Sequence, residues 1–173
     1  MSRGSRRPAT TEESKALAHP DRLRIIRLTY ETALTNKQLA ERLGRNPGTT
    51  LYHLRMLVAT GFVAADAPRR GARGSSEVPY RSTGKSWTLD VGERDMDSAT
   101  TAVVDAFRVE LLESPPESRR TSRLALRITP EQRVELEARL EALVEEAASW
   151  PRAADGEPWA LFIAMHERAG AGS

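Results

Sequence analysis

The sequence contains no cysteine among its 173 residues. That absence excludes disulfides, thiol catalysis and every metal site built on cysteine. No run of 18 apolar residues occurs, so we expect no membrane-spanning helix and no membrane partner. The N-terminal stretch MSRGSRRPATTEE lacks the apolar segment of a secretory signal. A cytoplasmic location is therefore the expectation.

Patterns for catalysis and metal binding are also missing. The three histidines, His19, His53 and His166, are scattered singly, and none has a partner at ligand spacing. Neither glycine-rich segment, RRGARG or AGAGS, follows a strand and opens a helix, so neither predicts a phosphate-binding loop. No combination of a nucleophile with a base stands out. We therefore expect no enzyme, no bound metal and no cofactor.

The charge of the sequence is divided unevenly along the chain. Residues 1–90 hold 16 Lys and Arg against 8 Asp and Glu, a net charge of +8, whereas residues 91–173 hold 10 against 16, a net charge of −6. A basic region favours binding to phosphates, and the acidic region should be repelled by them. Because such imbalance also occurs in ordinary soluble domains, the inference depends on a motif within the basic half.

That motif lies between Thr35 and Val63. Thr35 and Gln38 have the spacing of a helix capping box, and Gly44 is suited to end the helix. Asn46 can cap the next helix, with Pro47 at its first position. The periodicity predicts an inner face of Thr50, Leu54, Leu57 and Val58, and an outer face of Gly48, Thr49, Tyr52, His53 and Arg55. This pattern predicts a helix-turn-helix, with an ordinary helical hairpin as the alternative.

The flanking segments complete a predicted winged helix-turn-helix domain at residues 10–92. Residues 1–9 read as a disordered basic tail, Thr10 and Glu13 can cap a helix reaching His19, and Pro20 opens a second helix. After the motif, FVAAD and VPYRS predict two strands. The loop between them carries Arg69, Arg70 and Arg73, which suit the minor groove of DNA, although a solvated linker is the alternative.

Residues 93–173 are expected to form a dimerisation or effector region. A helix should run from Asp97 or Ser98 to Glu113, with the stripe Val103, Val104, Phe107 and Leu111. Residues 123–128 alternate like a strand, Thr129-Pro130 starts an amphipathic helix reaching Ser149, and WALFIAMHE reads as another strand. Two strands alone are marginal, so another subunit or the long helix should complete the sheet. The fold class is thus α+β, mainly α, with a C-terminal helix and a strand-helix-strand extension.

Two segments resemble the ArsR-type winged-helix repressors over about residues 15–90. They carry Ala18-His19-Pro20-x-Arg22-x-x-Ile25 and His53-Leu54-x-x-Leu57-x-x-x-Gly61-Phe62-Val63, and the wing is similar to an actinobacterial branch. The resemblance implies a cytoplasmic homodimer on an imperfect palindrome, paired through the first helix and the helix after the wing. It places these residues at the major groove: Asn46, Pro47, Gly48, Thr49, Leu51 and Tyr52. The cysteine pair of the metal-sensing members is missing, so metal sensing is set aside.

The candidate function is sequence-specific binding of double-stranded DNA by a homodimeric repressor. Further expected DNA contacts are His53, which could instead pack within the fold, and Lys37, Arg55 and Arg81. Leu17 joins the stripe of residues 103–111 in the expected dimer interface. The acidic tail could extend that interface, bind another protein, or enclose a small-molecule effector lined by Trp150, Trp159, Phe162 and Met165. The alternative function is a winged-helix protein-interaction module without specific DNA binding.

Overall fold

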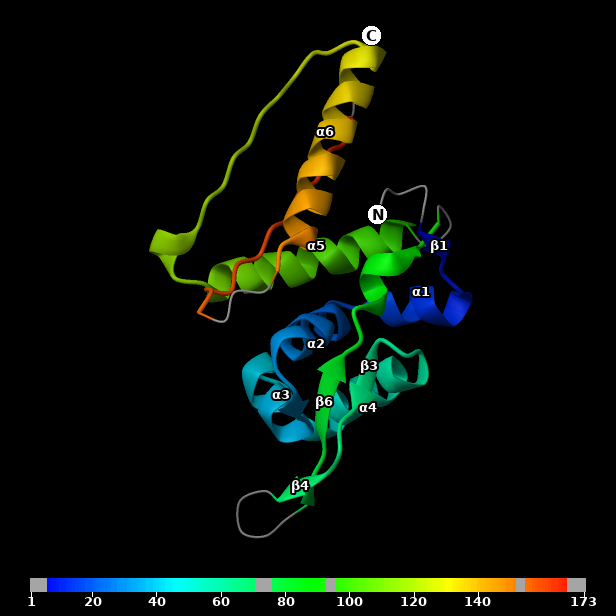
Figure 1. Ribbon diagram of the computed structural model, residues 1–173, viewed down its shortest axis with the longest axis vertical. Helices are drawn as coiled ribbons and strands as arrows, with labels where there is room; N and C mark the ends of the chain where they lie inside the picture. The colour runs from blue at the N-terminus through cyan, green and yellow to red at the C-terminus, as the bar shows by residue number, and fades with distance from the viewer. Residues whose placement is uncertain (1–5, 71–75, 93–95, 152–154, 168–173) are drawn as a thin grey trace. The chain divides into compact units, whose positions relative to one another are not determined.

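The computed structural model describes residues 6–70, 76–92, 96–151 and 155–167 (Figure 1). The chain divides into two compact units, Met1–Ala125 and Leu126–Ser173. The first unit holds α1 to α5 and the strands β1 to β7, whereas the second holds α6. The predicted class, α+β and mainly α, is confirmed. Among the described helices, none combines the length and apolar character that crossing a membrane would need.

The first two helices are α1 (Thr11–Leu17) and α2 (Pro20–Glu31). Thr10 and Glu13 form the predicted capping box of α1. The helix ends at Leu17 rather than His19, because His19 has an extended backbone and caps α2 by accepting the Asp21 N–H at 3.1 Å. Leu17 is buried within the core of its own chain. Its expected place in a dimer interface is therefore wrong.

The predicted pair of helices forms as α3 (Asn36–Leu43) and α4 (Pro47–Ala59). The Thr35–Gln38 capping box, the left-handed Gly44 (φ 63°) and the Asn46 cap are all present. Leu39, Leu54 and Leu57 are fully buried with Ile25 of α2 in one hydrophobic core. Val58 was expected on this inner face, but it is 40% exposed, and His53 occupies the inner face instead.

The two strands after α4 form the predicted wing. Strands β3 (Val63–Ala65) and β6 (Pro79–Ser82) pair antiparallel, with Ala64 opposite Arg81. The short strand β2 (Leu34–Thr35) joins β6, so the sheet has the order β2-β6-β3. A separate hairpin of β4 (Arg69–Arg70) and β5 (Ser76–Glu77) extends the wing (Figure 1). The sequence did not predict β2, because two residues are too few to show a strand periodicity. Arg73 lies outside the described residues.

The described N-terminal residues contact the segment that follows the wing. Strand β1 (Arg7–Pro8) pairs parallel with β7 (Leu89–Asp90), which follows the 3-10 helix η3 (Lys85–Thr88). The Arg6 guanidinium lies 5.0 Å from the centroid of the Trp87 ring. The prediction of a disordered tail at residues 1–9 is therefore wrong for residues 6–9, whereas residues 1–5 lie outside the described part of the chain.

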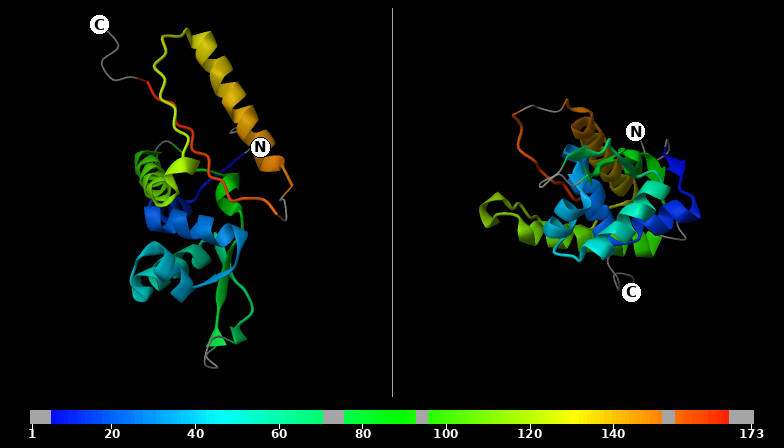
Figure 2. Two further views of the ribbon diagram at one scale, coloured as in Figure 1. Left: turned by 90° about the vertical axis from the view of Figure 1, so that its left-hand side faces the viewer. Right: turned by 90° about the horizontal axis from the view of Figure 1, so that it is seen from below.

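Helix α5 (Met96–Glu113) packs against α2, at the end of the first unit opposite the β4–β5 hairpin (Figure 2). Its buried stripe consists of Ala99, Ala102 and Ala106, and these small side chains let the two helices approach closely. Of the predicted apolar stripe, Val103 and Val104 do not face this core, since they are 40% and 41% exposed, whereas Phe107 and Leu111 are half-buried. One guanidinium nitrogen of Arg24, Nη2, donates to both carboxylate oxygens of Glu113, at 2.7 and 2.6 Å, and this ion pair also joins α2 to α5.

In the second unit, α6 (Pro130–Ser149) begins and ends as predicted, with a Thr129–Gln132 capping box. The strands predicted at residues 123–128 and 159–167 are wrong, because both segments are irregular in the structure. Leu124 is 78% exposed, and neither segment has a partner strand among the described residues. Trp150, Trp159 and Met165 are exposed as well, so they do not enclose the expected effector cavity; Phe162 is half-buried.

Candidate nucleic-acid interface

The solvent-facing surface of α4 brings together most of the residues that were predicted to contact DNA from this helix. Gly48, Thr49, Tyr52 and Arg55 are exposed at helical spacing, and the Tyr52 ring is 60% exposed. Leu51 is half-buried at the edge of this surface. We call Gly48, Thr49, Tyr52 and Arg55 the α4 surface. It offers a hydroxyl, a phenol and a guanidinium, which can donate hydrogen bonds to base edges or phosphates.

Two asparagines fix the beginning of α4. The Asn46 Oδ1 accepts the Gly48 N–H at 2.7 Å, and the Asn36 Nδ2 donates to the Pro47 carbonyl at 3.0 Å. The oxygen of Asn46 is therefore engaged in capping, although its position is exposed. The role of Asn36 was missed, because its contact depends on how α3 meets α4. Both bonds orient the positive end of the helix dipole, which favours contact with an anion.

His53 does not lie on the α4 surface as predicted. Its side chain is 5% exposed, and its ring lies 4.4 Å from that of His19, centroid to centroid. The description of the histidines as scattered singly is therefore wrong for this pair. The available signal was the spacing of Thr50, His53, Leu54 and Leu57, which is that of one helix face. The His53 ring also supports the exposed Tyr52 ring edge-on, at 5.5 Å.

The surroundings of the two histidines are basic and buried. Burial, and then the Arg22 charge, lowers the pKa of His19. Burial, and then the His19 ring, lowers the pKa of His53. Arg22 itself donates to the Ala16 and Lys15 carbonyls at 2.6 Å each, so it caps the end of α1. Both rings are therefore predominantly neutral near pH 7.

The remaining predicted cationic contacts lie around this surface. Lys37 is exposed on the first turn of α3, and Arg69 and Arg70 are exposed on the β4–β5 hairpin. The Arg81 guanidinium is 3.4 Å from the Asp66 carboxylate, so its charge is partly balanced. Arg45 was missed by the sequence reasoning; it is half-exposed and bonds Asp21 at 2.9 Å. Lys37, Arg69 and Arg70 are thus exposed cations of the same unit, whereas Arg45 and Arg81 are paired with carboxylates.

Residues 17–64 match a family model described as a helix-turn-helix domain. Within this segment, α3 and α4 form a helix-turn-helix, and the β2-β6-β3 sheet adjoins them as a wing. The predicted winged helix-turn-helix fold is confirmed.

Solved structures with similarity to about four-fifths of the chain include transcription regulators. An ArsR-like transcriptional regulator from Rhodococcus sp. RHA1 has 18% identity and a TM-score of 0.38, covering 81% of this chain and 91% of its own. A mutant of MepR from Staphylococcus aureus, bound to an oligodeoxyribonucleotide, has 14% identity and a TM-score of 0.33, with coverages of 80% and 79%. A mutant of ZitR from Lactococcus lactis has 16% identity and a TM-score of 0.31, with coverages of 77% and 82%. A comparison with curated proteins finds no significant match.

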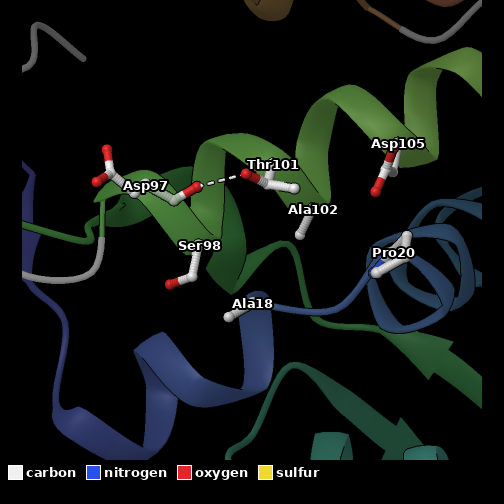
Figure 3. A pocket seen from close by; sticks show the side chains of 7 residues that line it. All are labelled: Ala18, Pro20, Asp97, Ser98, Thr101, Ala102 and Asp105. Atoms are coloured by element: carbon white, nitrogen blue, oxygen red, sulfur yellow. Dashed lines mark hydrogen bonds between the residues drawn. The ribbon is translucent and has the colours of Figure 1, made fainter.

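A shallow cavity of ≈ 340 Å³ lies where α5 passes the junction of α1 and α2, beside the helix-turn-helix domain (Figure 3). Its lining from α5 includes Asp97, Ser98, Thr101 and Asp105, and Ala18 and Pro20 line the opposite side. The Thr101 hydroxyl is already bonded to the Asp97 carbonyl at 2.8 Å. None of the four residues predicted to line an effector site belongs to this cavity.

Proposed function

We propose that the protein is a homodimeric repressor that binds a specific double-stranded DNA site, an imperfect palindrome, in the cytoplasm. The observation that carries this proposal is the α4 surface, where Thr49, Tyr52 and Arg55 project from a helix whose start is fixed. A helix-turn-helix domain inserts this helix into the major groove with its N-terminal residues foremost. The small Gly48 allows the backbone to approach the DNA closely at that end.

The proposed contacts divide between base reading and positioning. Thr49 and Tyr52 read base edges, and the half-buried Leu51 meets a thymine methyl; each good base contact gives about 1–3 kcal/mol of discrimination. Lys37 and Arg55 bind phosphates, whereas Arg69 and Arg70 of the β4–β5 hairpin contact the minor groove or the DNA backbone. The exposure of Lys37, Arg55, Arg69 and Arg70 supports this division, since phosphate contacts provide most of the sequence-independent affinity.

A second copy of the chain is the proposed dimer partner. One helix-turn-helix domain covers too few base pairs for a unique site, whereas two related by a two-fold axis read half-sites about 34 Å apart. Val103 and Val104 of α5 are apolar and about two-fifths exposed, whereas Phe107 and Leu111 of the predicted stripe are half-buried. The exposed Val103 and Val104 support α5 as the pairing element.

The proposed function is tested by fluorescence anisotropy with genomic fragments, including the protein's own promoter, over a salt series. We expect a sequence-preferential complex that Thr49→Ala and Tyr52→Ala each weaken about fivefold or more. Arg133→Ala on α6 is the matched control, because it removes an exposed arginine outside the helix-turn-helix domain. Equal affinity for all fragments would instead favour a protein-interaction module.

The dimer is tested separately by light scattering at micromolar concentration. We expect a mass twice that of the 19.1 kDa chain. Val104→Glu should shift the mass towards one chain, because it introduces charge into the proposed apolar contact. Glu146→Gln, a change at an exposed position of α6, should leave the mass unaltered. A wild-type protein that scatters as a single chain would exclude the proposed dimer.

A further inference from the structure

Three side chains able to bind a metal meet between α2 and α4. His19 and Asp21 belong to the start of α2, His53 lies in the middle of α4, and their ligand atoms lie within 4.8 Å of one another. We propose that this cluster binds a divalent first-row transition cation such as Zn²⁺, through two imidazole nitrogens and one carboxylate oxygen. Two histidines and a carboxylate are a ligand set that such ions prefer, and water supplies the fourth position.

The second observation is a buried ring nitrogen without a partner. His53 is 5% exposed, and its Nδ1 forms no hydrogen bond within the described part of the chain. Buried polar atoms in folded proteins are nearly always satisfied, and an ion is one of the groups that can satisfy them. His19 is only half-buried, whereas Asp21 and His53 are buried. The exposed side of His19 therefore offers a cation its route to the cluster.

The separation of the ligand atoms requires a small contraction when the ion binds. Tetrahedral coordination with bonds of about 2.0–2.2 Å puts ligand atoms about 3.4 Å apart, compared with the upper limit of 4.8 Å here. Rotation of the side chains can close part of this difference. The rest would draw α4 towards α2, because the three ligands belong to these two helices and the cap between α1 and α2.

Two existing interactions compete with the ion. The Asp21 carboxylate bonds Arg45 at 2.9 Å, but the Arg45 side chain is 54% exposed and can turn into solvent. His19 Nδ1 accepts the Asp21 N–H and thereby caps α2. A neutral imidazole has only one ring nitrogen that can accept a hydrogen bond or bind a metal, so coordination of His19 removes this cap. Loss of the cap disfavours the folded helix by about fivefold in its equilibrium constant. The free energy of metal–imidazole bonds can exceed this cost. The nearby Arg22 opposes the cation, so we expect an affinity below that of structural zinc sites.

The test titrates the full chain with Co²⁺ and reads the visible absorption of the tetrahedral ion, with Zn²⁺ calorimetry for stoichiometry. We expect one ion per chain. His19→Asn and His53→Gln should each weaken binding at least tenfold, whereas His166→Ala should not change it. His166 is the matched control, because it is the remaining histidine and lies in the second unit. Circular dichroism verifies that each variant is folded.

A fourth variant separates the proposed site from a structural histidine pair. Arg45→Gln frees the Asp21 carboxylate and should tighten binding about threefold to tenfold, since it removes a competing positive charge. This result decides the question even if His53→Gln does not fold. The proposal is wrong if wild type binds no ion at about 1 mM, or if binding is the same in wild type, His19→Asn and Arg45→Gln.

An effect of the ion on DNA binding rests on the proposed function. Because the contraction moves the recognition helix α4, Zn²⁺ should change the affinity for the DNA site in wild type and not in His19→Asn. Unchanged DNA affinity beside an intact Co²⁺ spectrum would reject this coupling. Absence of DNA binding with and without Zn²⁺ would instead reject the proposed function, and the Co²⁺ titration would still decide the metal site.

Discussion

The Lys85 ammonium lies 2.6 Å from the Glu13 carboxylate and donates to the Thr60 carbonyl, also at 2.6 Å. Lys85 follows the wing, Glu13 belongs to α1, and Thr60 caps the end of α4. Glu13 also accepts two hydrogen bonds from the Arg7 guanidinium, at 2.8 and 3.1 Å. One carboxylate thus joins the N-terminal segment to the wing, and through Lys85 to the end of the recognition helix.

Removal of the Lys85 charge should destabilise the first unit. Lys85→Met should lower the free energy of unfolding by about 1–3 kcal/mol, because it leaves the buried Glu13 with one cation fewer. Urea denaturation followed by circular dichroism measures the loss. Lys15→Met is the control, since that side chain is exposed on α1. Equal losses in the two variants would show that the Lys85–Glu13 contact is not stabilising.

The stability should depend on acid through Glu13. Hydrogen bonds from Arg7, then from Lys85 and the Thr10 N–H, lower the pKa of Glu13 from 4.5 to about 2. The unfolded chain therefore binds this proton more readily, so the stabilisation is complete above pH 4.5 and is lost as the pH falls towards about 2. Urea unfolding should find Glu13→Gln less stable than wild type at pH 7. A difference between the two proteins that is constant from pH 6 to pH 2 would contradict this assignment.

Close packing of α5 on α2 should not tolerate a larger side chain at the alanine stripe. Ala106 is 5% exposed, so Ala106→Leu should cost about 1–3 kcal/mol through overpacking. Thr100→Leu is the matched control, because it adds a leucine at an exposed position of the same helix. Thermal unfolding compares the two variants. Equal melting temperatures would mean that the alanine stripe of α5 accommodates a larger side chain without loss of stability.

The wing hairpin should contribute mainly sequence-independent affinity for DNA. Arg69→Ala with Arg70→Ala should weaken binding to every fragment and reduce the slope of log K against log salt by about one per lost phosphate contact. The double variant Arg133→Ala with Arg139→Ala is the control, since both arginines form exposed ion pairs on α6. Anisotropy at several salt concentrations gives both slopes. If the wing variant keeps the wild-type slope, the hairpin does not bind phosphates.

Local signals explain why the helix boundaries could be predicted. The Thr35–Gln38 capping box, Gly44, and Asn46 followed by Pro47 each act within a few residues, so their effect does not depend on the rest of the fold. The same holds for the Thr129–Gln132 box that starts α6. Predictions failed where partners distant in the sequence decide the outcome. Residues 123–128 alternate like a strand, but no described strand lies beside them to accept their hydrogen bonds.

The α4 helix shows both cases within one element. Its sequence determined where it begins, and it determined that Thr49, Tyr52 and Arg55 share one exposed face, because helical geometry alone sets those relations. Only the tertiary structure decided that His53 meets His19, since packing of α4 on α2 brings the two rings together. In the same way, the sequence determined the amphipathic length of α5, but its packing on α2 placed the alanines inside and Val103 and Val104 outside. Periodicity identifies a face, whereas the shape of the neighbouring helix selects which face is buried.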